Sequence, residues 1–180
     1  VLAFGNFLPP DPYVENDDYT ASPKYFRDQW SPDLASIKET DDVLIIGTGL
    51  SMVDLVMGYN QARHKGKILA ISTRGMLSAI HELGHTYPAF YDELRSMTRI
   101  TDMLRAVRRH IAKAHDDGSD WRAVIDSLRP FTHRLWRQLP LAERRYFMQH
   151  LSRYWNVARH RMPAEAAEVV EKMQRDGRLS

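Results

Sequence analysis

The feature that most constrains the fold is an apolar run that leads directly into a glycine turn. Val43–Ile46 holds four apolar residues, three of them β-branched, and Gly47, Thr48 and Gly49 follow at once. A helical pattern begins at Leu50. A short, fully apolar run bounded by turn residues predicts a buried parallel strand. The order of strand, glycine turn and helix is typical of a site that binds the pyrophosphate of a dinucleotide.

In this interpretation, the residues of the turn have separate roles. Gly47 lets the chain turn sharply off the strand, and Gly49 has no side chain to block the phosphates. The free N–H groups of the first helical turn point at the negative charge. The fingerprint is incomplete, because Met52 stands where a third small residue would let helix and strand pack closely. We predict cofactor contacts at Gly47, Thr48, Gly49, Leu50 and Ser51.

A second strand is predicted over residues 67–74, after a helix over residues 50–64 and a turn at Lys65 and Gly66. The end of this strand approaches the adenine ribose, where an NAD site usually places an acidic residue. Here Thr73 and Arg74 stand instead. A hydroxyl and a guanidinium suit a 2′-phosphate, so the sequence favours NADP over NAD. The alternative is that Arg74 is an ordinary solvated loop residue.

Composition restricts the class of protein further. The chain has 180 residues and no cysteine, which excludes disulfides and thiolate chemistry and fits the cytoplasm. No apolar run reaches the roughly 20 residues of a membrane span, and no signal peptide opens the chain, so we expect no membrane partner. Residues 1–42 carry nine acidic and three basic side chains, which indicates an acidic linker. The oligomeric state is not determined by the sequence.

The helical pattern from residue 89 onward predicts four helices, over about 90–115, 119–139, 141–158 and 163–177. Ser119 is the expected N-cap of the second helix, and Pro130 should break it. The predicted fold is therefore α/β: a partial Rossmann-like parallel sheet followed by an all-helical subdomain. We divide the chain into residues 1–42, a nucleotide-binding unit over 43–88, and the helical subdomain over 89–180.

A competing motif is His81-Glu82-Leu83-Gly84-His85, which matches H-E-x-x-H. On a helix, two histidines four residues apart could bind zinc while the glutamate acts as a base, as in a zinc-dependent hydrolase. Gly84 and the nearby Pro88 oppose a firm helix here. We therefore assign no metal ligand and keep the zinc hydrolase as an alternative.

A second alternative is a nucleic-acid-binding module. In the helical region, aromatic side chains alternate with arginines, and Arg159, His160 and Arg161 form a dense basic cluster. Such residues can contact phosphates and stack on bases. Amphipathic helices also place aromatic residues in the core and arginines on the solvent-exposed face. We therefore favour a structural role for these residues over nucleic-acid binding. The basic cluster could grip an anion or stabilise a helix C-terminus.

The chain resembles a bacterial group of uncharacterised FAD/NAD(P)-binding proteins, relatives of the flavin-containing monooxygenases with two dinucleotide-binding domains. Residues 1–6 are similar to the strand that closes the FAD half of such proteins. The turn at residues 47–51 is similar to their second, NAD(P)-binding turn. Two later patterns, within residues 121–130 and 154–163, resemble the group's own.

The resemblance implies that this chain is the central portion of a flavoprotein. The parent protein would be an NAD(P)H- and FAD-dependent oxidoreductase, in which hydride passes from NAD(P)H to an FAD held by the remainder of the protein. Residues 1–42 would then comprise the end of the FAD-domain strand and the acidic linker. The cofactors would supply the chemistry, so no catalytic side chain is assigned, and this portion alone should be inactive.

Overall fold

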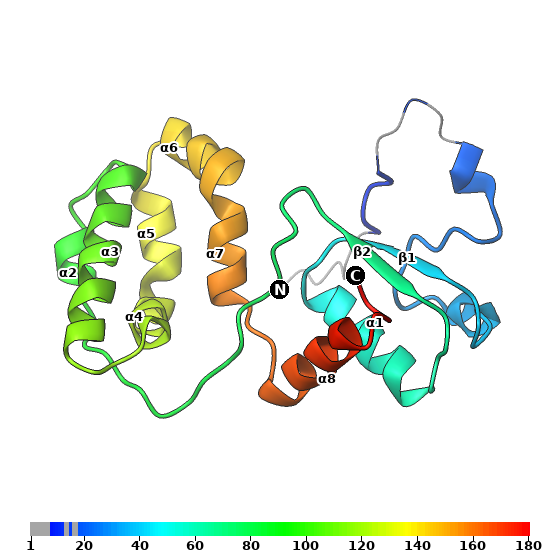
Figure 1. The fold of residues 1–180 in the computed structure, drawn as a ribbon. Coiled ribbons are helices and arrows are strands. Elements are labelled where there is room, and N and C mark those ends of the chain that lie inside the picture. Colours follow the sequence, from blue (N-terminus) through cyan, green and yellow to red (C-terminus); the bar gives the residue numbers. More distant parts are fainter. Residues whose placement is uncertain (1–7, 13–14, 16–17) are drawn as a thin grey trace.

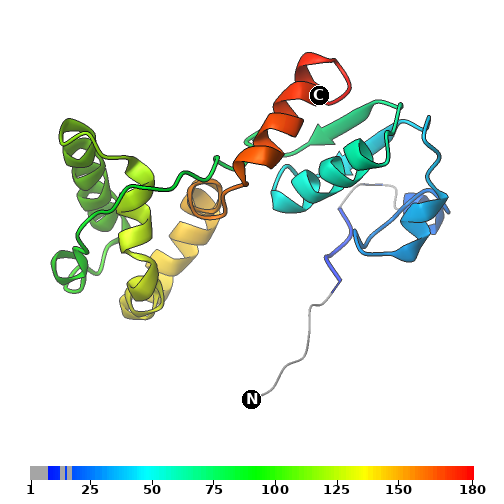
Figure 2. The same cartoon turned by 90° about the horizontal axis from the view of Figure 1, so that it is seen from below.

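The computed structural model describes residues 8–12, 15 and 18–180. The strand expected at residues 1–5 lies outside the described residues. The chain forms two lobes, each with its own buried apolar core (Figure 1). We call them the sheet lobe, which contains the helices and strands of residues 43–71 and 164–180, and the helical lobe, which contains the helices of residues 91–159. The view in Figure 2 shows the same two lobes side by side, joined by extended segments.

The sheet lobe contains the predicted strand, turn and helix. Strand β1 (Val43–Ile46) leads through the glycine turn into α1 (Leu50–Gln61), and β2 (Ile68–Ile71) follows. The strands pair in parallel, with Val43 opposite Ile68 and Ile46 opposite Ile71. The chain is thus a mixed α/β protein, mostly helical, with a small two-stranded parallel sheet. The second strand is shorter than the predicted range of 67–74, and α1 ends before residue 64.

The last three residues lie along the other edge of β2. The N–H of Ile68 donates to the carbonyl of Arg178 at 2.8 Å, and the N–H of Ser180 donates to the carbonyl of Ile68 at 3.0 Å. The N–H of Ala70 donates to the carbonyl of Ser180 at 2.8 Å. These bonds make a parallel bridge between Ile68 and Leu179. The spatial order is therefore β1, β2 and residues 178–180.

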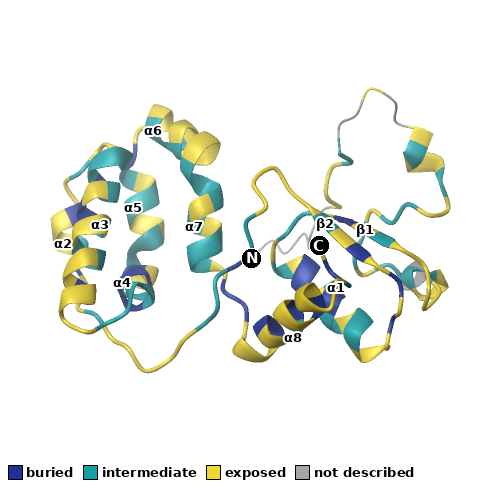
Figure 3. Cartoon of the chain, viewed as in Figure 1, coloured by how far each residue is buried: buried dark blue, intermediate teal, exposed yellow. Residues whose placement is uncertain are grey.

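Helices α1 and α8 (Ala164–Arg175) pack against each other and cover one face of the sheet. The buried side chains there are Ile45, Ile68, Met52, Val53, Val56, Met162, Ala166, Ala167, Val170, Met173 and Leu179. The other face carries Leu44, Ile46, Leu69 and Ile71, which remain 44–57% exposed (Figure 3). Because side chains alternate along a strand, one fully apolar strand supplies both a buried and an open apolar face.

The helical lobe consists of α2 (Tyr91–Leu94), α3 (Ile100–Asp116), α4 (Trp121–Ser127), α5 (Thr132–Gln138), α6 (Leu141–Tyr146) and α7 (Ser152–Arg159). A π-helical turn over Phe147–Leu151 joins α6 to α7. The buried core side chains are Phe90, Leu94, Met103, Ala106, Ala114, Val124, Leu128 and Leu139.

Several helix boundaries differ from the sequence prediction, and the helix expected over 141–158 is interrupted by the π-helical turn. The helix expected over 90–115 is two helices, and the N-cap of α4 is Asp120 rather than Ser119. Ser119 instead closes α3: its N–H donates to the carbonyl of Ala114 at 2.7 Å, next to Gly118 at φ 72°. Asp120 then accepts a hydrogen bond from the N–H of Arg122 at 2.7 Å. The predicted break at Pro130 is confirmed by the short 3-10 turn Arg129–Phe131.

The division of the chain at residues 42 and 88 stays a prediction, although α8 shares the sheet core and not the helical core.

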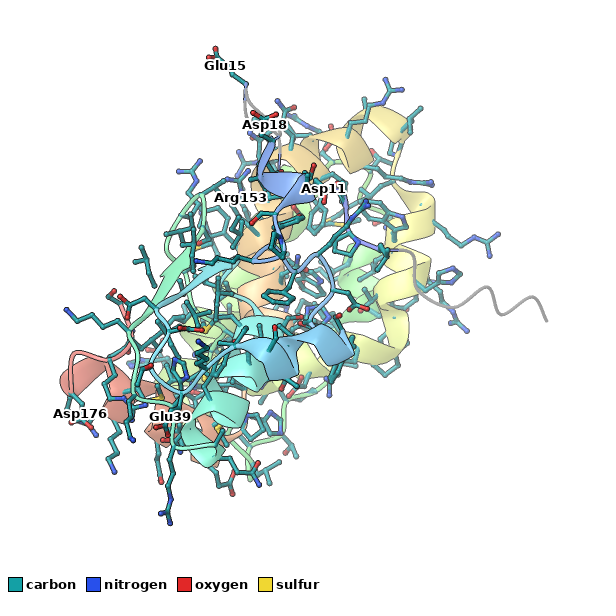
Figure 4. All side chains as sticks on the ribbon, turned by 90° about the vertical axis from the view of Figure 1, so that its right-hand side faces the viewer. Asp11, Glu15, Asp18, Glu39, Arg153 and Asp176 are labelled. Carbon is teal, nitrogen blue, oxygen red and sulfur yellow. The ribbon has the colours of Figure 1, made fainter. Side chains whose placement is uncertain are left out.

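Before β1, the described residues hold two short 3-10 helices, η1 (Asp18–Ala21) and η2 (Pro32–Ser36). In Figure 4, the acidic residues Asp11, Glu15 and Asp18 lie at one end of the view, and Glu39 and Asp176 lie at the other. Within the described part of the chain, no helix combines the length and the apolar character that a membrane crossing requires.

The alternation along β1 predicts unequal losses of stability for neighbouring leucine and isoleucine truncations. Ile45→Ala removes a side chain from the core, where Ile45 is 8% exposed, and should lower the free energy of unfolding by about 2–4 kcal/mol. Leu44→Ala removes a side chain from the open face and should cost under about 1 kcal/mol. Urea denaturation followed by circular dichroism measures both. Equal losses would contradict the open face.

A carboxylate between α2 and α3 predicts a pH dependence of stability. Glu93 accepts a hydrogen bond from Arg109 and lies 2.8 Å from Nε2 of His110. The hydrogen bond with His110, followed by the charges of His110 and Arg109, holds the pKa of Glu93 below its ordinary 4.5. The contribution of Glu93 to stability is therefore complete above pH 4.5 and is lost as the pH falls through the folded pKa.

Glu93→Gln should accordingly lower Tm at pH 7, and the difference from the wild type should shrink toward pH 3. Thermal melts at a series of pH values measure this difference. Glu168→Gln, which changes an exposed carboxylate on α8, is the matched control and should leave the pH profile as it is. A Glu93→Gln profile parallel to that of the wild type would contradict the assignment.

Candidate functional site

The candidate site is the turn between β1 and α1, at the carboxyl edge of the sheet. Gly47 has φ 116°, a conformation that favours glycine, and its N–H donates to the carbonyl of Ile71 at 2.7 Å. Gly49 is the N-cap of α1 in an extended conformation, and no side chain caps the helix there. The first N–H groups of an α-helix have no intrahelical acceptor, and no side chain of the N-cap residue accepts from those of Leu50 and Ser51.

The turn is open. A Cβ atom added at Gly47 or Gly49 would meet no atom within 4 Å, and Gly49 and Ser51 are exposed. A diphosphate can therefore approach the main chain at this bend. An uncapped helix N-terminus with accessible N–H groups attracts an anion through its dipole and its hydrogen bonds.

Thr48 connects the turn to the loop after β2. Its hydroxyl oxygen lies 2.7 Å from the carbonyl oxygen of Met76 and 2.9 Å from Oγ of Ser72. The Ser72 hydroxyl also accepts a hydrogen bond from the N–H of Gly75 at 3.0 Å. Because these contacts occupy the Thr48 hydroxyl, this residue would reach a phosphate through its backbone, while its side chain positions the loop.

Thr73 and Arg74, the two residues predicted for the ribose phosphate, lie in this loop and are exposed. They follow β2 as the glycine turn follows β1, and the carboxyl ends of parallel strands lie at one edge of a sheet. The structure therefore brings all seven predicted cofactor residues to the same edge.

The H-E-x-x-H segment does not form the helix that zinc binding by this motif needs. Residues 81–85 are irregular, and Gly84 has φ 100°. The Glu82 carboxylate pairs with the guanidinium of Arg122 at 3.1 Å. No group of three metal-ligating side chains gathers in the part of the chain that the structure describes. Without the helix, His81 and His85 are not held on one face.

Two arginines of the helical lobe contact its tryptophans. Arg144 lies 5.8 Å from the ring centre of Trp136 and donates to the carbonyls of Leu139 and Arg137 at 2.8 and 2.7 Å. Arg122 lies 4.7 Å from the ring centre of Trp121. These contacts support the structural interpretation over a stacking platform for bases.

A second cluster of functional side chains was only partly visible in the sequence. Arg159 and Arg161 stood out as a basic run, but Arg129, Asp126 and His81, which lie beside them, are distant in the sequence. No spacing rule joins these positions, because three different segments supply them. One sequence signal links two of these segments: residues 121–130 and residues 154–163 both resemble patterns of the same group of proteins.

The comparisons with known proteins add no relative. No family model, curated protein or solved structure matches the chain.

The geometry of the turn predicts opposite effects for alanine at two glycines. At Gly47, alanine would be forced into φ 116° and should cost about 1–2 kcal/mol of stability. At Gly58, inside α1 and with open space around it, alanine should add about 0.5–1 kcal/mol. Chemical denaturation of the two variants measures both signs. Two changes of the same sign would refute the described conformation of the turn.

Proposed function

We propose that this chain is the NAD(P)H-binding portion of a flavin-dependent oxidoreductase, whose FAD is held by another part of the protein. The observation that carries the proposal is the open glycine turn with an uncapped helix N-terminus at the carboxyl edge of a parallel sheet. Dinucleotide pyrophosphates bind at such turns in α/β proteins. Gly47, Thr48, Gly49, Leu50 and Ser51 would seat the pyrophosphate.

The order of the sheet supports a Rossmann-like unit. In the doubly wound nucleotide-binding fold, the first three strands lie side by side in the order 3-2-1. Here residues 178–180, β2 and β1 lie in that order and are parallel. The two crossover helices α1 and α8 cover the same face, which also fits such a unit. The helical lobe would then be an insertion between the second strand and the second crossover helix.

The open apolar face supports a larger sheet domain around this unit. Strands of parallel sheets are apolar throughout because helices cover both of their faces. In this chain the face with Leu44, Ile46, Leu69 and Ile71 is without helices in the described residues. A covering layer from the remainder of a flavoprotein would bury it.

Thr73 and Arg74 favour NADPH over NADH in this proposal. A guanidinium can form charge-assisted hydrogen bonds with a 2′-phosphate, which NAD lacks. The cofactors supply the redox chemistry, so the residues of this chain would bind and orient the nucleotide rather than react. Turnover would require the FAD-binding part of the protein.

Titration of the purified chain with NADPH and with NADH tests the proposal. NADPH should bind more tightly, and Arg74→Gln should weaken NADPH binding by about tenfold while leaving NADH binding unchanged. Gly49→Val, whose Cβ would meet no atom within 4 Å in the free chain, should abolish binding of both nucleotides because its side chain would occupy the path of the phosphates. Isothermal titration calorimetry measures the affinity of the wild type and of both variants for each nucleotide.

The control is Arg175→Gln, an exposed arginine in the last turn of α8, at the opposite edge of the sheet. It should bind both nucleotides as the wild type does. Binding that survives Gly49→Val unchanged, or failure of both nucleotides to bind the wild-type chain, would overturn the proposed site.

A further inference from the structure

A second site lies at the junction of the two lobes. A cavity of about 300 Å³ is lined by His81, Arg129, Arg159, Arg161 and Pro163. Figures 1 and 2 show where the segment after β2 and the segment between α7 and α8 pass between the lobes. The lining residues come from these two segments and from the 3-10 turn after α4. None of the residues of the glycine turn lines the cavity.

Backbone hydrogen bonds fix the two crossing segments against each other. The N–H of Met162 donates to the carbonyl of Ala79, and the N–H of His81 donates to the carbonyl of Met162, each at 2.8 Å. The N–H of Ala79 donates to the carbonyl of Val157 at 3.1 Å. The side chains of His81 and Arg161 are therefore held at set positions on neighbouring backbone.

The cavity contains more positive than negative charge. Asp126 is the only acidic partner that the described residues provide for its arginines. Its Oδ1 accepts a hydrogen bond from Arg161 and lies 3.5 Å from Nε of Arg129. Within the described chain, Arg159 has no carboxylate at ion-pair distance. Arg129 and Arg161 thus share a single carboxylate and Arg159 has none at this distance, which leaves an excess of two positive charges among the three guanidiniums.

One of these guanidiniums is buried and incompletely paired. The Arg161 side chain is only 2% exposed, and its Nη1 has no hydrogen-bond partner although the atom is buried. A buried cationic donor without an acceptor is costly, because it has lost its water and gained nothing in return. Burial and the charge of Arg129, with a smaller contribution from Arg161, lower the pKa of Arg159 against the opposing charge of Asp126.

A purely structural role accounts for only part of this arrangement. Arg159 ends α7, where a cation is favourable to the helix dipole. Arg161 also lies 5.9 Å from the ring centre of Trp121, a cation–π distance. Neither contact supplies an acceptor for Nη1 of Arg161 or explains why Arg129, Arg159 and Arg161 converge on one cavity. An anion in the cavity would satisfy the donor and balance the charge.

We propose that this cavity binds a phosphate group, in the form of a phosphomonoester dianion. The excess of two positive charges matches a dianion, and guanidiniums form paired hydrogen bonds with phosphate oxygens. Arg159 holds the phosphate from the end of α7, Arg161 from the segment between α7 and α8, and Arg129 from the 3-10 turn of the helical lobe. A ring nitrogen of His81 provides a further hydrogen bond. The ligand bridges the lobes and stabilises their contact. This inference does not depend on the proposed function of the glycine turn.

Calorimetric titration of the whole chain with inorganic phosphate, at constant ionic strength and with chloride as the comparison anion, tests the site. Phosphate should bind saturably at one site and raise Tm, and chloride should not. Arg159→Gln and Arg129→Gln should each weaken phosphate binding by about tenfold. Arg159 has no ion pair to lose in the described chain, so its variant should keep the fold, which circular dichroism verifies.

Arg134→Gln is the matched control, because it changes an exposed arginine of α5 that does not line the cavity. It should bind phosphate as the wild type does. A competition titration with NADPH identifies the source of the phosphate: displacement would assign the site to a phosphate of the dinucleotide, and independent binding would assign it to a separate phosphorylated small molecule. Both results require saturable binding. No saturable binding, or equal weakening in all three variants, would overturn the proposal.

Discussion

The parallel register of β1 and β2 is the constraint on which the rest of the structure depends. It places the glycine turn and the loop with Thr73 and Arg74 at the same edge of the sheet, although about 25 residues separate them. The hydrogen bond from Gly47 to the carbonyl of Ile71 ends the pairing just where the chain turns away. The same register sets which side chains enter the core beneath α1 and α8 and which remain on the open face.

The sequence was most informative where the interactions are local. The order of strand, turn and helix at residues 43–61 follows from apolar patterning and two glycines, and the break at Pro130 follows from a missing N–H. The predicted N-cap of α4 is wrong because Ser119 and Asp120 are adjacent and both are favourable N-cap residues. The closure of α3 uses the backbone of Ser119, which leaves the position to Asp120.

Contacts between distant segments were beyond the reach of sequence patterns. The amphipathic helix α8 looks like the others, so nothing in its pattern assigns it to the sheet core rather than the helical core. The pairing of residues 178–180 with β2 depends on the position of α8 and could not be predicted without it. The arginine cavity likewise needs three segments, of which only the run at residues 159–161 was visible in advance. The cofactor assignment itself stays a prediction.

The backbone contact between Ile80 and Met162 has a consequence for how such a chain could be assembled. Residues that pair in a ladder lie about 5 Å apart, so the chain leaves the sheet lobe and returns to it at nearly the same point. Because the bridge is parallel, a crossover loop of about a dozen residues, rather than a tight turn, could replace everything between. The helical lobe has the topology of a cassette, which insertion or deletion of a single DNA segment could add or remove without disturbing the strands on either side.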